Sequence, residues 1–186
     1  EGNFIFARRM GGTNVERAYG MAVDPVSGSI YVAGEFAGSV DFDPGPATAT
    51  LIASGVDGFF ARYDPNGNYL YARRIGGTAT DQALSIKLDA SGNVWVAGLF
   101  NGTARMSASP AVSLTSVGGA DGFLAKYDIN GNHLFSMRMG GTSTVLPPAL
   151  SIDATGYVYV TGEFRKVADF GPDAANLSLT SAGYAD

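Results

Sequence analysis

The chain has 186 residues, a net charge of −5 and no cysteine, with 46% apolar and only 16% charged residues. Its length is sufficient for one ordinary domain with a hydrophobic core, and its composition excludes a disordered chain or a charged coiled coil. The acidic balance, without any basic stripe, argues against nucleic acid as a partner. No apolar run approaches the roughly 18 residues of a membrane span, and cysteine-based sites are excluded.

The same motifs occur three times along the chain. Gly11-Gly12-Thr13 returns at residues 76–78 and 140–142, and Gly34 returns as Gly98 and Gly162, 64 residues apart both times. A fixed period of this kind predicts a repeat architecture, in which each unit packs against its neighbours. It also argues against an enzyme with one active site, because catalytic groups would be repeated with the scaffold.

In chain order, the second repeat shows four strand signals, each ended by a turn. They cover residues 69–75, 83–88, 94–100 and 122–127, and a further short strand is expected at 112–116. Glycine, asparagine and aspartate separate these segments, as is typical of tight turns. Because residues 94–100 are apolar on both faces, we expect this strand to lie between two other sheets, as in a β-propeller blade.

The predicted fold is therefore all-β: β-propeller blades, in three repeats of about 64 residues with four or five antiparallel strands each and no significant helix. We expect residues 1–186 to form a single β-propeller-type repeat domain with units at approximately 1–65, 66–129 and 130–186. Three blades lie below the usual range of about four to eight.

The repeat positions at which the chain begins and ends predict that one strand is missing between the last repeat and the first. The chain begins at a position equivalent to residue 66 and ends at Asp186, which matches Asp121, so the counterpart of residues 122–129 is missing. We expect the chain to be part of a longer array or to be completed by another chain, with a six-bladed dimer as the simplest closed form. The expected partners are other copies or further repeats, which would bind the open strand edges at the termini.

The ordered motifs resemble a known family. Ala22-Val23-Asp24, a Val-Tyr-Val-Ala-Gly-like strand, Asp-Phe-Asp-Pro-Gly at 41–45 and Asp-Gly-Phe-Phe-Ala-Arg-Tyr-Asp at 57–64 resemble SBBP-type bacterial β-propeller repeats. The resemblance covers essentially the whole chain in three copies. It implies a bacterial, exported or cell-surface β-propeller that is often part of a longer protein, but it implies no activity.

Calcium is the one metal that the sequence suggests. Asp41 and Asp43, with Asp169 and Asp173 in the third repeat, lie in Gly/Pro turns that can present several oxygen ligands. The second repeat has Met106 and Ser107 there, and no complete calcium loop is present. We therefore favour turns stabilised by Asp side chains, with calcium as the alternative and no other cofactor. The segments at 24–28, 64–68 and 128–132, each with an aspartate followed by a glycine, are similar to metal-binding loops, but their spacing between strands favours hairpin turns.

Three other repeated sets each allow two interpretations. The recurring arginines could bind acidic glycans, but pairing with a neighbouring carboxylate is favoured. The recurring aromatics could stack on sugar rings, but packing between blades is favoured. Glu35 and Glu163 could form a hydrolytic carboxylate pair, but Leu99 replaces them in the second repeat. The arginines are Arg9, Arg74 and Arg138, and the aromatics are Tyr31, Trp95 and Tyr159 together with Phe36, Phe100 and Phe164.

Taken together, these features predict a non-enzymatic extracellular structural or interaction module that serves assembly or adhesion. The alternative is a propeller that binds carbohydrate, such as surface glycan, or another ligand through its variable loops. A hydrolase with axial carboxylates is less expected, since His133 is the only histidine and a His-based triad is impossible within one chain. The composition, poor in lysine and rich in small residues, favours an extracellular location, and the family resemblance implies export to a bacterial cell surface.

Overall fold

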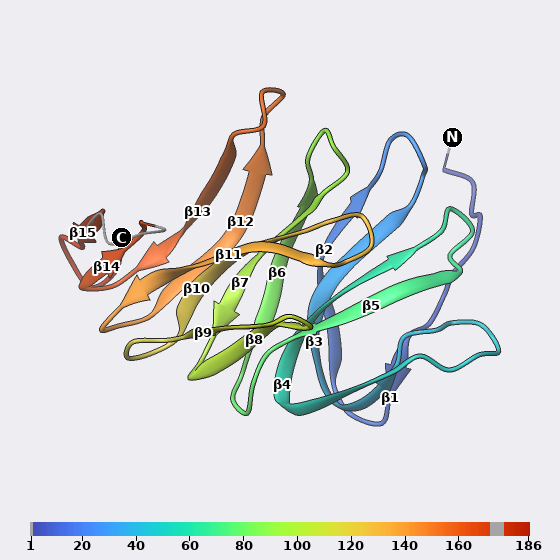
Figure 1. Cartoon of the computed structure of the whole chain (residues 1–186), viewed down its shortest axis with the longest axis horizontal. Coiled ribbons are helices and arrows are strands. Elements are labelled where there is room, and N and C mark those ends of the chain that lie inside the picture. The colour runs from blue at the N-terminus through green and yellow to red at the C-terminus, as the bar shows by residue number, and fades with distance from the viewer. Residues whose placement is uncertain (1, 172–176) are drawn as a thin grey trace.

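The structure, a computed structural model, describes residues 2–171 and 177–186 and is shown in Figure 1. Within these residues every regular element is a β-strand, and all pairings within the sheets are antiparallel. The described residues include no helix that is long and apolar enough to cross a membrane. The all-β class and the antiparallel sheets expected from the repeats are thus confirmed.

Two repeats each form a four-stranded antiparallel sheet, which we call blade 1 and blade 2. In both blades the second strand pairs with the first and the third, and the third pairs with the fourth. Blade 1 consists of β2 (Glu16–Val23), β3 (Ile30–Asp41), β4 (Thr50–Tyr63) and β5 (Tyr69–Ile75), and blade 2 of β6 (Gln82–Leu88), β7 (Val94–Phe100), β10 (Asp121–Tyr127) and β11 (His133–Gly141).

Residues 145–164 form only the first two strands of a sheet, which we call blade 3. These are β12 (Val145–Ile152) and β13 (Val158–Phe164), and they pair only with each other in the described sheet. The register of β12 shifts between Leu146 and Ala149, where Pro147 and Pro148 lie. Proline is tolerated there because a bulge removes the need for a ladder N–H.

Between the second and third strand of each repeat, the chain forms a hairpin. In blade 1 this hairpin is the extension of β3 and β4, whereas blade 2 has separate strands β8 (Thr103–Ala108) and β9 (Ala111–Thr115). The third repeat has β14 (Val167–Asp169) and β15 (Ser178–Thr180). The Gly-Gly turns pair with these hairpins, through β1 (Gly11–Gly12) on β3 and through Gly140 on β14. The expected single short strand of the insert is thus a two-stranded hairpin.

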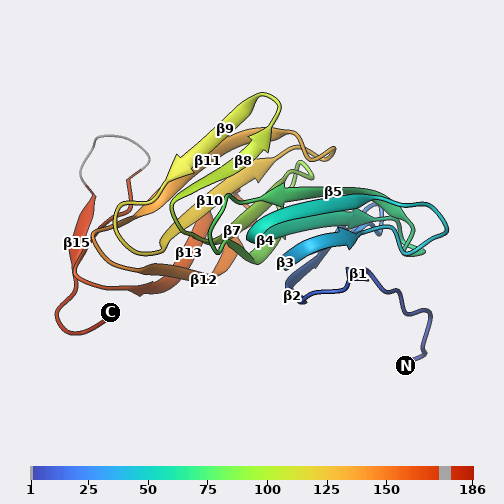
Figure 2. The ribbon, with the colours of Figure 1, turned by 90° about the horizontal axis from the view of Figure 1, so that it is seen from below.

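The blades stack through their faces, as Figures 1 and 2 show, with β6 of blade 2 lying against blade 1 and β12 of blade 3 lying against blade 2. Side chains from both blades form the core between blade 1 and blade 2, where Tyr31, Phe60, Val96, Phe123 and Tyr127 are all at most 2% exposed. A smaller cluster lies between blade 2 and blade 3. The second strands are therefore buried on both faces, as the sequence predicted, wherever a blade has two neighbours.

The recurring glycine of the second strand lies opposite a bulge in the first. A Cβ atom at Gly98 would overlap the carbonyl oxygen of Gln82 and approach Phe123 Cε1 to 2.7 Å. The pairing of β6 with β7 shifts register between Ala83 and Ser85, directly beside this glycine. The sequence-based expectation of a close backbone approach or a bulge at Gly98 is thus confirmed, and the structure shows both together.

Candidate interaction site

The repeated carboxylates at the start of the third strands are buried in ion pairs. Asp57 and Asp121 are fully buried, and they lie 2.6 Å from Arg74 Nε and 2.9 Å from Arg138 Nη1, respectively. Burial raises the pKa of Asp57, while backbone N–H groups and Arg74 oppose that rise. Pairing of the repeated arginines with neighbouring carboxylates is thus confirmed for two of the three, and each pair joins the third and fourth strands of one blade.

Asp81 is a second buried carboxylate beside the Gly-Gly turn of blade 2. Its two oxygens accept hydrogen bonds from the backbone N–H of Gly77 at 2.8 Å and of Asn101 at 3.1 Å. Burial raises its pKa to about 6, and the nearby charge of Asp57 acts in the same direction. Sequence reasoning missed this residue, because its repeat counterparts are Glu16 and Val145 and no motif marks it.

The two glutamates considered as a hydrolytic pair are each engaged elsewhere. Glu35 is buried, pairs with Arg17 and accepts a hydrogen bond from Gln82, and Glu163 lies 3.1 Å from Arg165. Although burial by itself would raise the pKa of Glu35, the hydrogen bonds from Gln82 and Arg17 lower it. A general acid for glycoside hydrolysis needs a raised pKa, so the environment of Glu35 does not suit that role.

The calcium candidates form Asp-stabilised turns. Asp41 Oδ1 accepts hydrogen bonds from the backbone N–H of Asp43 and Ala49, and Asp43 Oδ1 accepts one from Gly45. Asp169 Oδ1 accepts one from Gly171, whereas Asp173 lies outside the described residues. Within residues 2–171 and 177–186, no three acidic or histidine side chains come together in a way that could hold a metal ion. Calcium binding here stays a prediction.

The hairpin turns are built as the sequence predicted. Asp64 Oδ1 accepts hydrogen bonds from the backbone N–H of Asn66 at 2.8 Å and of Asn68 at 2.9 Å, and Asp128 does the same in blade 2. Asp24 accepts one from Val26 at 2.9 Å. These carboxylates satisfy the backbone of their own turns, which is the ordinary role of aspartate there.

The recurring aromatics pack in the cores of blades 1 and 2. Tyr31 and Phe100 lie between these two blades, and Phe36 packs against Phe42 and Phe59 within blade 1. Tyr31 is 1% exposed, Phe36 and Phe100 are fully buried, and Trp95 is half-buried between blade 2 and blade 3. Tyr159, their counterpart in blade 3, is 58% exposed, and Phe164 is only half-buried. Core packing is thus confirmed for blades 1 and 2, while the same side chains are open at blade 3.

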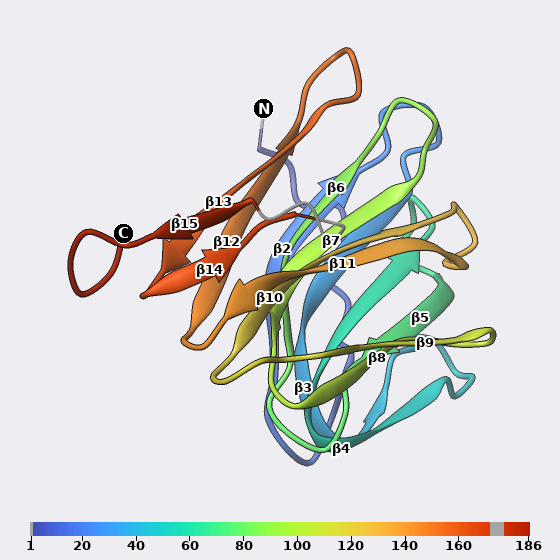
Figure 3. The ribbon, with the colours of Figure 1, turned by 60° about the vertical axis from the view of Figure 1, so that its left-hand side comes forward.

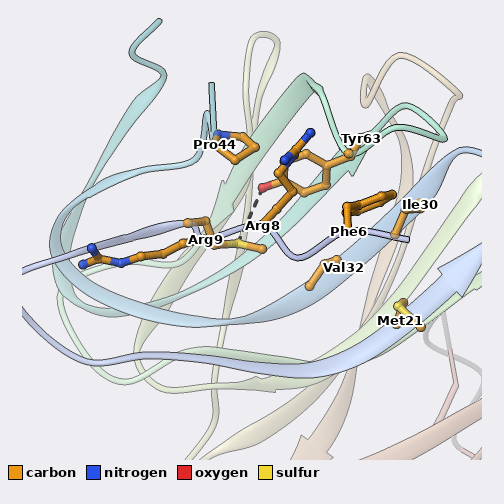
Figure 4. Close-up of a pocket in the computed structure, with 10 residues that line it drawn as sticks. Phe6, Arg8, Arg9, Met21, Ile30, Val32, Pro44 and Tyr63 are labelled. Carbon is orange, nitrogen blue, oxygen red and sulfur yellow. Dashed lines mark hydrogen bonds between the residues drawn. The ribbon is translucent and has the colours of Figure 1, made fainter. Parts of the chain in front are cut away.

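The first end face of the stack lies on blade 1, where the N-terminal segment crosses it. Figure 4 shows an apolar pocket of about 260 Å³ between Phe6 and Arg8 of this segment and Ile30, Val32 and Tyr63 of blade 1. The hydroxyl of Tyr63 lies 3.5 Å from the sulfur of Met10. We call this surface the N-terminal face.

The N-terminal segment takes the place of an outer strand of a preceding blade. A Cβ atom at Gly67 would meet Phe6 and Arg8, just as one at Gly131 would meet Tyr71 and Arg73 of blade 1. Arg8 donates to the carbonyl of Asn66, as Arg73 donates to that of Asn130. Both arginines also lie over the aromatic ring two residues before them. The segment therefore repeats the contacts that β5 makes with blade 2.

The second end face lies on blade 3, at the opposite end of the stack from the N-terminal segment, as Figures 1 and 2 show, and Figure 3 turns this end toward the viewer. A groove of about 510 Å³ runs between blade 2 and blade 3. Its lining is mainly apolar and includes Leu124, Met137, Val158, Val160, Phe164 and Phe170. We call this surface, with the free edge of β13, the C-terminal face.

A third hollow, of about 380 Å³, is polar and lies beside the inserted hairpin of blade 2. It is lined by Arg74 and Arg105, with Ser54, Thr103 and Ser113 around them. Arg74 already pairs with Asp57, so Arg105 is the guanidinium with more freedom to meet a ligand. A small polar ligand that binds to the variable loops would bind at this surface.

Comparison with known proteins agrees with a repeat fold but shows no family. No family model matches the chain, so membership of the SBBP group stays a prediction. The chain is 28% identical over 167 residues to regulatory protein FlaEY of Caulobacter vibrioides, covering 88% of this chain and 17% of that protein. It is 25% identical over 125 residues to uncharacterized WD repeat-containing protein L264 of Acanthamoeba polyphaga mimivirus, covering 64% and 9%. The chain thus spans less than a fifth of the length of either relative. The weak similarity to a WD repeat protein supports a β-propeller-like repeat fold.

Proposed function

We propose that this chain is a non-enzymatic interaction module whose N-terminal and C-terminal faces associate with blades of the same repeat type. The observation that carries the proposal is the contrast between its polar and apolar groups. Asp57 and Asp121 are paired with arginines inside their own blades, whereas apolar hollows lie open beside the N-terminal segment and beside β13. Open apolar faces and free strand edges favour association with another sheet.

The similarity to a much longer WD repeat protein and to a regulatory protein supports an interaction role in general terms. Those names describe the relatives, and the partner of this chain is inferred from its own end faces. An exported, structural or adhesive role at a bacterial surface is part of this proposal, and its support is the composition and the resemblance described above.

Sedimentation velocity over a wide range of protein concentration tests the proposal. We expect self-association that weakens when Val32→Glu changes the N-terminal face or Val160→Glu changes the C-terminal face, because a charge in an apolar contact is costly. Val26→Glu, at a turn where the side chain is 94% exposed, is the matched control and should associate like the wild type. If the wild type stays monomeric at several hundred micromolar, the proposal is wrong.

The polar hollow beside Arg105 favours a second candidate function, the binding of an acidic carbohydrate through the inserted hairpin. A glycan array probed with the wild type and with Arg105→Ala would test it. Binding of anionic glycans that the substitution abolishes would support this function, and an array without hits would contradict it.

A further inference from the structure

The free edge of β13 is already prepared for one more strand. Phe164 and Asp186 exchange two backbone hydrogen bonds, of 2.8 and 3.0 Å, as the first pair of a new ladder. Asp186 occupies the repeat position of Asp57 and Asp121, which begin the same pairing with Phe36 and Phe100. Beyond Asp186, no described residue pairs with this edge, from Glu163 back to Val158.

Blade 2 shows what fills the equivalent space. Along β7, the residues from Leu99 to Val94 pair in order with Gly122 to Tyr127 of β10. Val94, Val96 and Phe100 are completely buried there, whereas their counterparts Val158, Val160 and Phe164 are half-buried. The missing neighbour of β13 is therefore a strand of about six residues, and the groove on the C-terminal face is the space that its side chains would occupy.

The aromatic cluster identifies one of these side chains. In blade 1, Phe36 packs edge-on against Phe42 at 5.5 Å, and Phe59 of the third strand completes the cluster at 4.8 Å from Phe42. In blade 3, Phe164 and Phe170 form the same edge-on pair at 5.4 Å, and both line the groove. An aromatic residue opposite Gly162 would complete this cluster.

A backbone carbonyl indicates a second side chain of the added strand. This side chain is a tyrosine, four positions after the aromatic residue. Tyr63 donates its hydroxyl to the carbonyl of Phe42 at 3.0 Å, and Tyr127 donates to that of Met106 at 2.9 Å. The residue at this repeat position in blade 3 is Phe170. A tyrosine opposite Val158 would therefore reach the carbonyl of Phe170 across the groove.

A basic residue is indicated at the position of the added strand directly before this tyrosine, which is Lys126 in blade 2. In blade 2, Lys126 lies 3.0 Å from Asp89 and over the ring of Trp95. Blade 3 has Asp153 and Tyr159 at these positions, with the tyrosine hydroxyl 3.0 Å from the carboxylate. A lysine or arginine opposite Tyr159 would find the same carboxylate and the same aromatic face.

We infer that the C-terminal face binds an extended strand of the type Gly-Phe-x-Ala-Lys/Arg-Tyr, which pairs antiparallel with β13. This inference rests on the proposed function and names its partner: a strand that carries the same repeat signature and is presented by another polypeptide. Main-chain hydrogen bonds would supply the affinity, and the aromatic, basic and tyrosine positions would supply the specificity.

A synthetic peptide with the sequence of residues 122–132 is the probe, because its first six residues pair with the equivalent edge of β7 in blade 2. We expect saturable binding that changes the fluorescence of Trp95, the only tryptophan, which lies between blade 2 and blade 3. Binding should also slow hydrogen exchange at Val158, Val160 and Gly162. Peptides with Phe123→Ser, Tyr127→Ser or Lys126→Glu should each bind more weakly, by about tenfold or more for the two aromatic positions.

Two protein variants separate this inference from the proposed function. Residues 158, 160, 162 and 164 direct their backbone N–H and C=O groups away from β12, toward the free edge. Val160→Pro removes one of these N–H groups and should abolish peptide binding. The variant protein should still melt cooperatively. Val32→Glu, on the opposite face, should weaken self-association and leave peptide binding unchanged. If the peptide fails to bind, or binds as its substituted forms do, the inference is overturned even where self-association persists.

Discussion

Single residues in this chain are repeated because the backbone geometry is repeated. Gly34, Gly98 and Gly162 each face the carbonyl of a bulged neighbouring strand, with no space for a Cβ atom. The sequence predicted this from recurrence alone. It did not predict the burial of Asp81, because the residue has no aspartate counterpart in the other repeats and burial depends on how the Gly-Gly turn and the following hairpin close over it.

Replacing Gly98 by valine should therefore destabilise the protein strongly. The new Cβ would collide with the backbone of β6 and with Phe123, so we expect a loss of about 3 kcal/mol or more in the free energy of unfolding. Gly183→Val is the control, because nothing lies within 4 Å of a Cβ atom built there. Urea denaturation of both variants measures the difference, and equal midpoints would contradict the close approach at Gly98.

The raised pKa of Asp81 predicts a pH dependence of stability. Its pKa is about 6 in the folded protein and 3.8 as the reference value, so the unfolded chain releases this proton first as the pH rises. Its contribution to stability is complete below the reference pKa and is lost as the pH rises from about 4 to about 6. Asp81→Asn should lose less stability than the wild type over this range. Urea unfolding at pH 4.5 and pH 7 tests this, and parallel losses in the two proteins would refute it.

At the scale of elements, the sequence located the strands and turns well and the inserted hairpins poorly. The Asp-Asn-Gly turns depend on local side-chain hydrogen bonds, so their residues predict them directly. The inserts differ in sequence among repeats and take their shape from tertiary contacts. One such contact is the hydroxyl of Tyr127, which donates to Met106 of β8 from the neighbouring strand β10.

Tyr127→Phe tests how the third strand holds the inserted hairpin. The substitution leaves the carbonyl of Met106 without this buried partner, so we expect a loss of about 1–2 kcal/mol in the free energy of unfolding. Tyr159→Phe removes a hydrogen bond from an exposed tyrosine and should cost much less. Chemical denaturation compares the two, and an equal cost would show that the buried bond has no special role.

At the scale of the whole molecule, the blades are alike in sequence but unequal in their surroundings. The period predicted the stack of sheets, because it follows from counting equivalent residues. It could not predict that the N-terminal segment would lie across blade 1 as an outer strand, with Arg8 on the carbonyl of Asn66. Nor could it predict the apolar groove beside β13, which depends on the packing of blade 3 against blade 2.

The central claim of this account is that β13 has one paired edge and one free edge, whereas β7 has two paired edges. Residue-resolved hydrogen exchange, at a concentration where the protein sediments as a monomer, measures this directly. We predict that the amides of Val94, Val96 and Gly98 exchange slowly and those of Val158, Val160 and Gly162 rapidly, while Tyr159 and Thr161, which face β12, stay protected. Equal protection of the two β13 sets in the monomer would contradict the account.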